Sequence, residues 1–147
     1  MSVEIKSLRS AELELFKPGI LRLMESARGS TEGEERFFNF WKSSLRTDTG
    51  RFLLAMDGPN VTGCLCAVFM ADDFSEAKRA VESHWFVLPE ARKSSAGLRL
   101  LSEFEREAKQ HGCRSIRTFT TGLSIGLTKI FERRGYKAVS VGFEKVI

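Results

Sequence analysis

A short run of two cations and four small residues is the part of the sequence best suited to chemistry. Residues 92–97 read Arg-Lys-Ser-Ser-Ala-Gly, between the apolar run 85–88 and an amphipathic segment. A strand, a turn and a helix N-terminus in this order expose backbone N–H groups, and the helix dipole adds partial positive charge. The small side chains would let a phosphate approach the backbone, so the loop predicts a site for a pyrophosphate-containing ligand. The alternative is an ordinary turn with two solvated surface charges.

The segment after this loop carries a single apolar stripe. Leu98, Leu101, Phe104 and Ala108 recur at helical spacing, with charged residues mostly on the other side. Ser94 or Ser95 is expected to cap the start of the helix, and Gly112 suits the position just past its end.

Two stretches of the chain resemble motifs of one enzyme family. Residues 87–97, Val-Leu-Pro-Glu-Ala-Arg-Lys-Ser-Ser-Ala-Gly, resemble the acetyl-CoA signature of the GNAT N-acetyltransferase superfamily, a strand ending in Val-x-Pro followed by Gln/Arg-x-x-Gly-x-Gly/Ala. Arg92 and Gly97 match that signature, and Ser95 stands where the first glycine is usual. Residues 130–136, Ile-Phe-Glu-Arg-Arg-Gly-Tyr, resemble the family's later Leu-Tyr-Glu-Lys-x-Gly-Phe segment. The order and spacing of the two motifs extend the resemblance over nearly the whole chain.

The resemblance implies acetyl-CoA as the cosubstrate and assigns it a set of residues. The backbone of Phe86, Val87 and Leu88 would bind the pantetheine and the thioester oxygen. The pyrophosphate would be bound by the backbone of Arg92, Lys93, Ser94, Ser95, Ala96 and Gly97.

On the later helix, the resemblance places Ser124 and Phe131 where many members have an asparagine and a proton-donating tyrosine. Phe131 has no proton to give, and Tyr136, the only tyrosine of the chain, aligns with a structural aromatic five residues later.

Two side chains on the strand that leads into the loop are candidates for the base that deprotonates the amine. Strand alternation puts Glu82 and His84 on one face, together with Phe86. A histidine titrates near neutral pH, and a carboxylate would serve if its pKa were raised. The alternative is that His84 is a hydrogen-bonded, half-buried residue and Glu82 a surface carboxylate. Glu82 is slightly favoured because such carboxylates recur on this strand in the family. The second histidine, His111, is expected to be a surface residue at a helix C-terminus.

The remaining elements must hold these residues in place. Alternation predicts strands at 2–8, 51–56, 61–70, 79–88, 114–120 and 136–147, and helical spacing predicts helices at 10–27, 31–45, 94–111 and 123–134. Pro18 predicts two short helices that meet near Lys17, and Thr31 with Glu34 predicts a capping box. The pattern indicates an α/β or α+β fold with a mixed sheet. The resemblance implies the order βααβββαβαβ, about six or seven mostly antiparallel strands and a splayed central strand pair.

An aromatic stripe marks the second predicted helix. Its members are Phe37, Phe38, Trp41 and Leu45. Stripes of this kind usually pack against a sheet. In GNAT folds the first helical pair also borders the acceptor cleft, so both roles are open for different residues.

Length and composition describe an ordinary globular chain. The 147 residues predict one domain spanning 1–147, with 42% hydrophobic and 29% charged residues, and no run is long enough to span a membrane. No signal peptide opens the chain, and Cys64, Cys66 and Cys113 have no metal-binding spacing, so a cytoplasmic location and no metal are expected. The net charge of +4 suits an anionic cofactor and is too diffuse to indicate nucleic acid.

Two functional hypotheses follow. The first is an N-acetyltransferase that moves an acetyl group from acetyl-CoA directly to a primary amine. The second is a non-catalytic module on the same fold, binding acyl-CoA, nucleic acid or protein. The acceptor is left open as a small molecule or a protein, and a homodimer is left open too.

Overall fold

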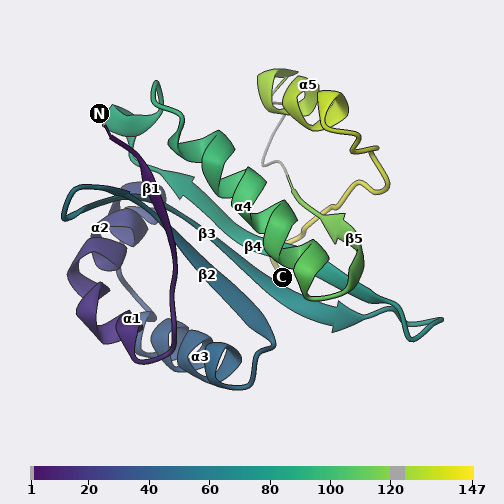
Figure 1. Cartoon of the computed structure of the whole chain (residues 1–147), viewed down its shortest axis with the longest axis horizontal. Coiled ribbons are helices and arrows are strands. Elements are labelled where there is room, and N and C mark those ends of the chain that lie inside the picture. Colours follow the sequence, from purple (N-terminus) through teal and green to yellow (C-terminus); the bar gives the residue numbers. More distant parts are fainter. Residues whose placement is uncertain (1, 120–124) are drawn as a thin grey trace.

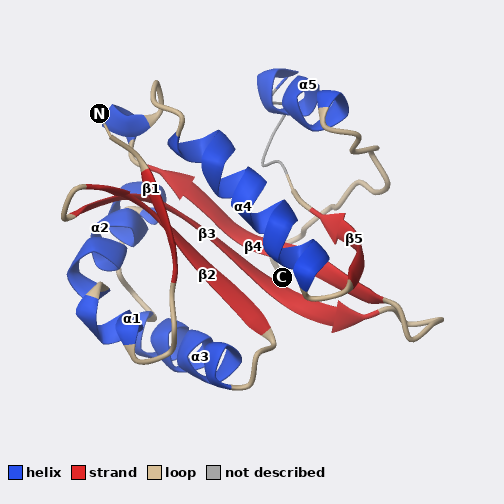
Figure 2. Ribbon diagram, viewed as in Figure 1, coloured by secondary structure: helices blue, strands red, loops and turns tan. Residues whose placement is uncertain are grey.

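The chain folds into one mixed sheet with helices on both faces. The computed structural model describes residues 2–119 and 125–147. In order, its elements are β1 (Glu4–Ser7), α1 (Glu12–Leu15), α2 (Lys17–Arg28), α3 (Glu34–Arg46), β2 (Gly50–Asp57), β3 (Asn60–Ala71), β4 (Lys78–Val87), the 3₁₀ turn η1 (Pro89–Ala91), α4 (Ala96–Gln110), β5 (Cys113–Arg117) and α5 (Ile125–Arg133). The strands lie in the order β1-β2-β3-β4-β5 (Figure 2), antiparallel from β1 to β4, with β5 parallel to β4. The predicted mixed sheet is confirmed, but it has five strands in the described residues, fewer than the six or seven predicted.

Strand alternation divides the core into two apolar clusters, one on each face of the sheet. Helices α1, α2 and α3 cover one face and α4 covers the other (Figure 1). Phe52 and Leu54 of β2 face α1, α2 and α3, whereas Leu53 and Ala55 face α4. Because both faces are covered, β2 and β3 read as continuous apolar runs. Cys64 and Cys66 lie in the first cluster as small buried groups, as their strand pattern predicts.

The N-terminal helices follow the sequence signals in part. The break at Pro18 is confirmed, because α1 ends at Leu15 and α2 begins at Lys17. The capping box is wrong. Gly33, with φ of 82°, precedes the first residue of α3, and it is the carbonyl of Thr31 that accepts the N–H of Glu34, at 3.1 Å. The left-handed glycine sets the start of this helix, and no side chain caps it.

The predicted strand at 136–147 is wrong. These residues form no regular secondary structure, and Val139, Val141 and Phe143 are 69%, 79% and 96% exposed. Their alternation is typical of a strand, but a strand also needs a neighbour to satisfy its backbone hydrogen bonds. The segment pairs with none of the described strands.

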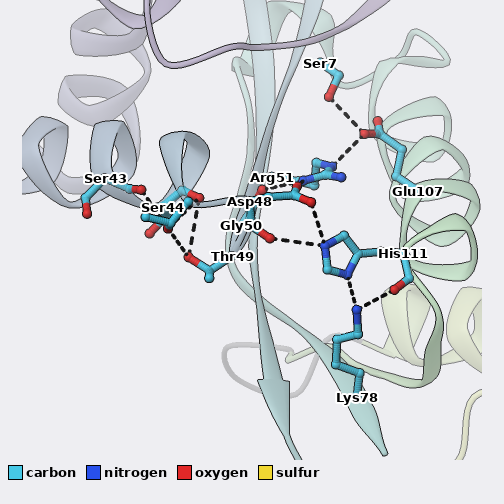
Figure 3. Close-up of polar contacts among 11 residues, drawn as sticks. Ser7, Ser43, Ser44, Asp48, Thr49, Gly50, Arg51, Lys78, Glu107 and His111 are labelled. Carbon is cyan, nitrogen blue, oxygen red and sulfur yellow. Dashed lines mark hydrogen bonds and ion pairs between the residues drawn. The ribbon is translucent and has the colours of Figure 1, made fainter.

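Polar contacts fasten the C-terminal half of α4 to the sheet (Figure 3). Buried Glu107 accepts hydrogen bonds from Ser7 Oγ of β1 and Arg51 Nε of β2, both at 3.0 Å. His111 is the C-cap residue of α4, and Lys78 of β4 donates to its carbonyl at 2.6 Å. Because these contacts hold its C-terminal half, α4 presents its N-terminus at the far end of β4, where the loop 92–97 lies.

Among the described residues, no helix is long and apolar enough to cross a bilayer.

Gly63 lets β3 approach β4 closely near that end. It pairs with Val87, and a Cβ built on it would lie 2.9 Å from the carbonyl oxygen of Phe86 and 3.3 Å from Leu100 Cδ1. One residue before Gly63, the pairing of β2 with β3 shifts register.

We predict that Gly63→Ala destabilises the protein by about 1–3 kcal/mol, because overpacking forces the backbone of β4 to move. Denaturant unfolding measures the change. Gly126→Ala on α5 is the matched control, since a Cβ there meets no atom of the described residues within 4 Å. It should be neutral or slightly stabilising. Equal stability of the two variants would mean that the approach at Gly63 imposes no constraint.

Candidate functional site

The site is organised by the divergence of β5 from β4. The two strands pair only from Lys78 to Val81 on β4 and from Cys113 to Arg117 on β5. β4 continues to Val87, and along residues 82–87 its edge has no paired neighbour on that side among the described residues (Figure 1). The predicted splayed pair is present, and it leaves backbone N–H and C=O groups open to a ligand or water.

The loop after β4 offers further unpaired backbone donors. The N–H groups of Ala91, Arg92 and Ser94 bond within the loop, and that of Ala96 donates to Ser94 Oγ at 3.2 Å. By contrast, the N–H groups of Lys93, Ser95, Gly97 and Leu98 have no acceptor among the described residues. They lie at or just before the first turn of α4, where donors are free and the dipole favours anions. Residues 92–97 thus form a loop with open backbone donors, and its binding of a pyrophosphate stays a prediction.

The side chains of this loop leave its free backbone N–H groups accessible. Arg92 and Lys93 are exposed, and Arg92 Nε donates to the carbonyl of Val87 at 3.2 Å. Ser95 is exposed, whereas Ala96 is fully buried. A Cβ at Gly97 would make ordinary contacts with Val87 at 3.7 Å and Trp85 at 3.9 Å. Alanine would therefore fit at this position.

A buried donor beside Gly97 has no partner among the described residues. The indole N–H of Trp85 is buried and has no acceptor in the described part of the chain. Buried tryptophan N–H groups usually find one. The ring lies 5.9 Å from that of Phe131, which is 8% exposed and packs 5.2 Å from the ring of Tyr136. Phe131 thus lies in the core on the α4 face of the sheet, beside this unpaired donor.

The two candidate bases lie on opposite faces of the sheet, so the prediction that they share a face is wrong. Glu82 pairs with Ala67 and His84 with Cys66, which leaves Ser83 as an extra residue in β4. Ala67 belongs to the cluster under α4, and Cys66 to the cluster under α1 to α3. Because directly paired residues point the same way, the β-bulge turns Glu82 toward α4 and His84 toward α2 and α3.

Glu82 is a buried carboxyl at the point where the strands separate. It is 6% exposed and follows Val81, the last residue of β4 that pairs with β5. Burial raises the pKa of Glu82 from 4.5 to about 7, and a hydrogen bond from the backbone N–H of Phe119 opposes the rise. Glu82 is therefore no surface carboxylate, and it can take or release a proton near neutral pH.

His84 lies against a pocket between the sheet and the first helices. Its ring centroid is 5.5 Å from Phe37, 5.9 Å from Phe86 and 6.4 Å from Trp41. Burial, and then the charge of Arg28, lower the pKa of His84. Neutral imidazole is thus the form held at neutral pH. The aromatic stripe divides as the sequence left open, because Phe38 and Trp41 are core residues whereas Phe37 lines the pocket.

The remaining predicted residues are placed as follows. Phe86 lines the pocket, Val87 packs under α4, and buried Leu88 donates its N–H to the carbonyl of Thr62 at 2.8 Å. Ser124 lies outside the described residues. Sequence reasoning assigned no role to Arg28 or to the indole of Trp85. Only the alternation of β4 hinted at Trp85, and no sequence signal marked Arg28. No cluster of possible metal ligands occurs within residues 2–119 and 125–147.

Comparison with known proteins points to one family. The profile of the Acetyltransferase (GNAT) family matches residues 17–136, and no curated protein matches the sequence. An aminoglycoside acetyltransferase from an uncultured soil metagenomic sample superposes with a TM-score of 0.80 at 14% identity, over 100% of this chain and 99% of the other. A GNAT family acetyltransferase of Staphylococcus aureus gives 0.76 at 20% identity, over all of both chains. A ribosomal-protein-alanine N-acetyltransferase of Brucella melitensis gives 0.70 at 13%, over 99% of each chain. At identities this low, the TM-scores show that these proteins share the fold of this chain and nothing more.

We predict that Glu82→Gln stabilises the protein at alkaline pH. The pKa of Glu82 rises from 4.5 to about 7 on folding. The contribution of this carboxyl to the unfolding free energy is therefore fully present below pH 4.5 and is lost as the pH rises through about 7. The shift corresponds to about 3 kcal/mol. Glutamine keeps an oxygen for the Phe119 N–H and cannot ionise, so the unfolding free energy of the variant should exceed that of wild type at pH 8 and match it near pH 4. Urea unfolding across this range measures both, and parallel pH curves would contradict the burial of an ionisable Glu82.

Proposed function

The chain belongs to the acetyltransferase (GNAT) family, and on this premise we propose that it moves an acetyl group from acetyl-CoA directly to a primary amine. The observation that carries the proposal is the junction of three features at the end of β4. These are the unpaired strand edge at 82–87, the free N–H groups of the loop 92–97, and two titratable side chains next to that edge.

The residues at this junction fit acetyl-CoA. The N–H groups of Lys93, Ser95, Gly97 and Leu98 would hold the pyrophosphate, with the exposed cations of Arg92 and Lys93 beside it. The open edge of β4, which includes Phe86 and Val87, would bind the pantetheine amides, and the indole N–H of Trp85 is a further donor without a partner among the described residues. The N–H of Leu88 already donates to the carbonyl of Thr62, so Leu88 would add no donor. When bound, acetyl-CoA supplies an acetyl group already activated as a thioester.

The protein then has to position the amine and take up its proton. His84 lines the pocket that we assign to the acceptor, and its lowered pKa keeps the imidazole free to accept a proton. Glu82 reaches the same strand edge from the other face, with a pKa near that of an ideal base at neutral pH. We assign the base to this pair, and the pH dependence distinguishes its members.

The proposal is tested by measuring acetyl-CoA binding and turnover separately. Acetyl-CoA should raise the melting temperature, because it binds the folded state alone. Release of free coenzyme A thiol should then require an amine. A stabilising shift without amine-dependent thiol release, across a broad panel of amines, would make the chain a binding module instead.

We predict that Gly97→Asp abolishes acetyl-CoA binding while the protein stays folded. The carboxylate would extend from the first turn of α4 into the space for the phosphates, where like charges repel. It suits the helix itself, since acidic residues are favourable at an N-terminus. Gly97→Ala is the matched control and should keep its affinity, because the added Cβ meets atoms no nearer than 3.7 Å. Isothermal titration gives both affinities, and tight binding by the aspartate variant would exclude this loop as the phosphate site.

We predict that the pH profile identifies the base. With an aliphatic primary amine as acceptor, kcat/KM calculated for the neutral amine should rise with pH and level off above the pKa of the base. An inflection near 7 that disappears in Glu82→Gln assigns the base to Glu82, whose pKa is about 7. An inflection below 6.5 that disappears in His84→Asn assigns it to His84, whose pKa is lowered from 6.5. General base catalysis is worth about 10²–10⁴-fold, so the relevant variant should lose activity on that scale. Two variants with unchanged profiles would exclude both residues.

A further inference from the structure

A small pocket on the His84 face of the sheet lies beside the open edge of β4. It is lined by residues from α2, α3, β3 and β4, namely Ile20, Leu23, Met24, Arg28, Phe37, Cys64, His84 and Phe86. Its volume is about 80 Å³. Phe86 lies on the strand segment proposed to bind the thioester, so a molecule in this pocket would be next to the reacting acetyl group.

The wall of the pocket is apolar over most of its surface. Ile20 and Leu23 are 1% exposed and Met24 is 3% exposed, so they are packed in place. An engineered cavity of about 150 Å³ binds benzene, and the present pocket is smaller than that. A short branched aliphatic group therefore fits it better than an aromatic ring does.

Among the described residues, Arg28, at the C-terminus of α2, is the only charged one that lines the pocket. One of its guanidinium nitrogens donates to the carbonyl of Glu32 at 3.1 Å, and its other N–H groups have no acceptor among the described residues. The guanidinium lies close enough to His84 to disfavour a second positive charge there. No acidic side chain from the described part of the chain lines the pocket. The electrostatics thus oppose a polycation and favour a carboxylate, which arginine binds well.

We propose that the acceptor is an aliphatic α-amino acid of about the size of leucine, whose side chain enters the pocket and whose carboxylate pairs with Arg28. This inference rests on the proposed acetyl transfer and narrows its substrate class. The side chain would occupy the space between Leu23, Met24 and Phe37, and the amine would lie toward His84 and the edge of β4. Aminoglycosides, which the similar soil enzyme acetylates by its name, carry several positive charges and no carboxylate, so they are excluded as acceptors here.

The test compares matched acceptors by thiol release at saturating acetyl-CoA. Leucine is set against isoamylamine, which has the same branched chain without the carboxylate, against glycine, which has the carboxylate without the chain, and against an aminoglycoside. Leucine should exceed glycine in kcat/KM by about tenfold or more, because burial of the side chain is lost in glycine. It should exceed isoamylamine by a similar factor, since a hydrogen bond to a charged group is lost.

Arg28→Gln separates the carboxylate contact from general damage. It should lower kcat/KM for leucine about tenfold more than for isoamylamine, since any change that acts through the pKa of His84 affects both acceptors alike. Arg36→Gln removes an equal charge from an exposed position on α3 that does not line the pocket, and it should change neither acceptor. Isothermal titration of leucine into the protein with coenzyme A gives a second readout, in which binding should weaken in Arg28→Gln and persist in Arg36→Gln.

The outcomes are distinct from those that test the transfer itself. Faster turnover of isoamylamine or the aminoglycoside than of leucine, or equal losses for leucine and isoamylamine in Arg28→Gln, would overturn the acceptor class and leave acetyl transfer in place. Absence of thiol release with every amine, together with acetyl-CoA binding, would overturn both proposals.

Discussion

Separation of β5 from β4 after Val81 is the constraint on which the site depends. Paired backbone groups inside a sheet are satisfied by their neighbours, but the edge of β4 along residues 82–87 has no such neighbour in the described chain. The rest of the fold keeps that edge open and rigid. β3 pairs with its other side as far as Val87, and α4 packs beneath it while its C-terminal half is fastened by Glu107 and His111. The loop donors at 92–97 then continue the line of open backbone groups beyond the end of the strand.

One extra residue in β4 decides which groups can reach the open edge. Without the bulge at Ser83, Glu82 and His84 would share a face, and the pocket between α2 and α3 would contain both. With the bulge, each face of the sheet contributes one titratable group to the edge of β4. Burial shifts the pKa values of the two groups in opposite directions. Burial favours the neutral form of either side chain, which raises the pKa of the acid and lowers that of the histidine. The carboxyl of Glu82, whose pKa is about 7, and the uncharged imidazole of His84 therefore lie on either side of the same backbone edge.

The sequence predicted what depends on local pattern and could not predict what depends on partners. Alternation located the five observed strands, helical spacing located the helices, and Pro18 marked the junction of α1 and α2. These signals act within a few residues of one another. The small residues at 92–97 likewise predicted an open loop. The alternation at 136–147 predicted a strand that does not form, since no pattern within the segment shows whether a neighbour is available. The bulge was missed for the same reason, because the register of β4 is set by β3. Arg28 approaches His84 only through the packing of α2 on the sheet, so the chain between them carries no trace of the contact.

The fate of the leaving group follows from where the phenol and the phenyl rings lie. Phe131 occupies the core position next to Trp85 and has no proton to donate. Tyr136 packs against it, but its hydroxyl donates to Glu105 at 3.0 Å, and burial together with the Glu105 charge raises the pKa of Tyr136. That proton is held by a carboxylate and is poorly available for transfer. A thiol has an ordinary pKa of about 8.5, only slightly above neutrality, so its thiolate can leave and take a proton from water. In the proposed reaction the protein therefore acts mainly before the bond breaks, by placing a neutral amine against the edge of β4 and removing its proton through Glu82 or His84.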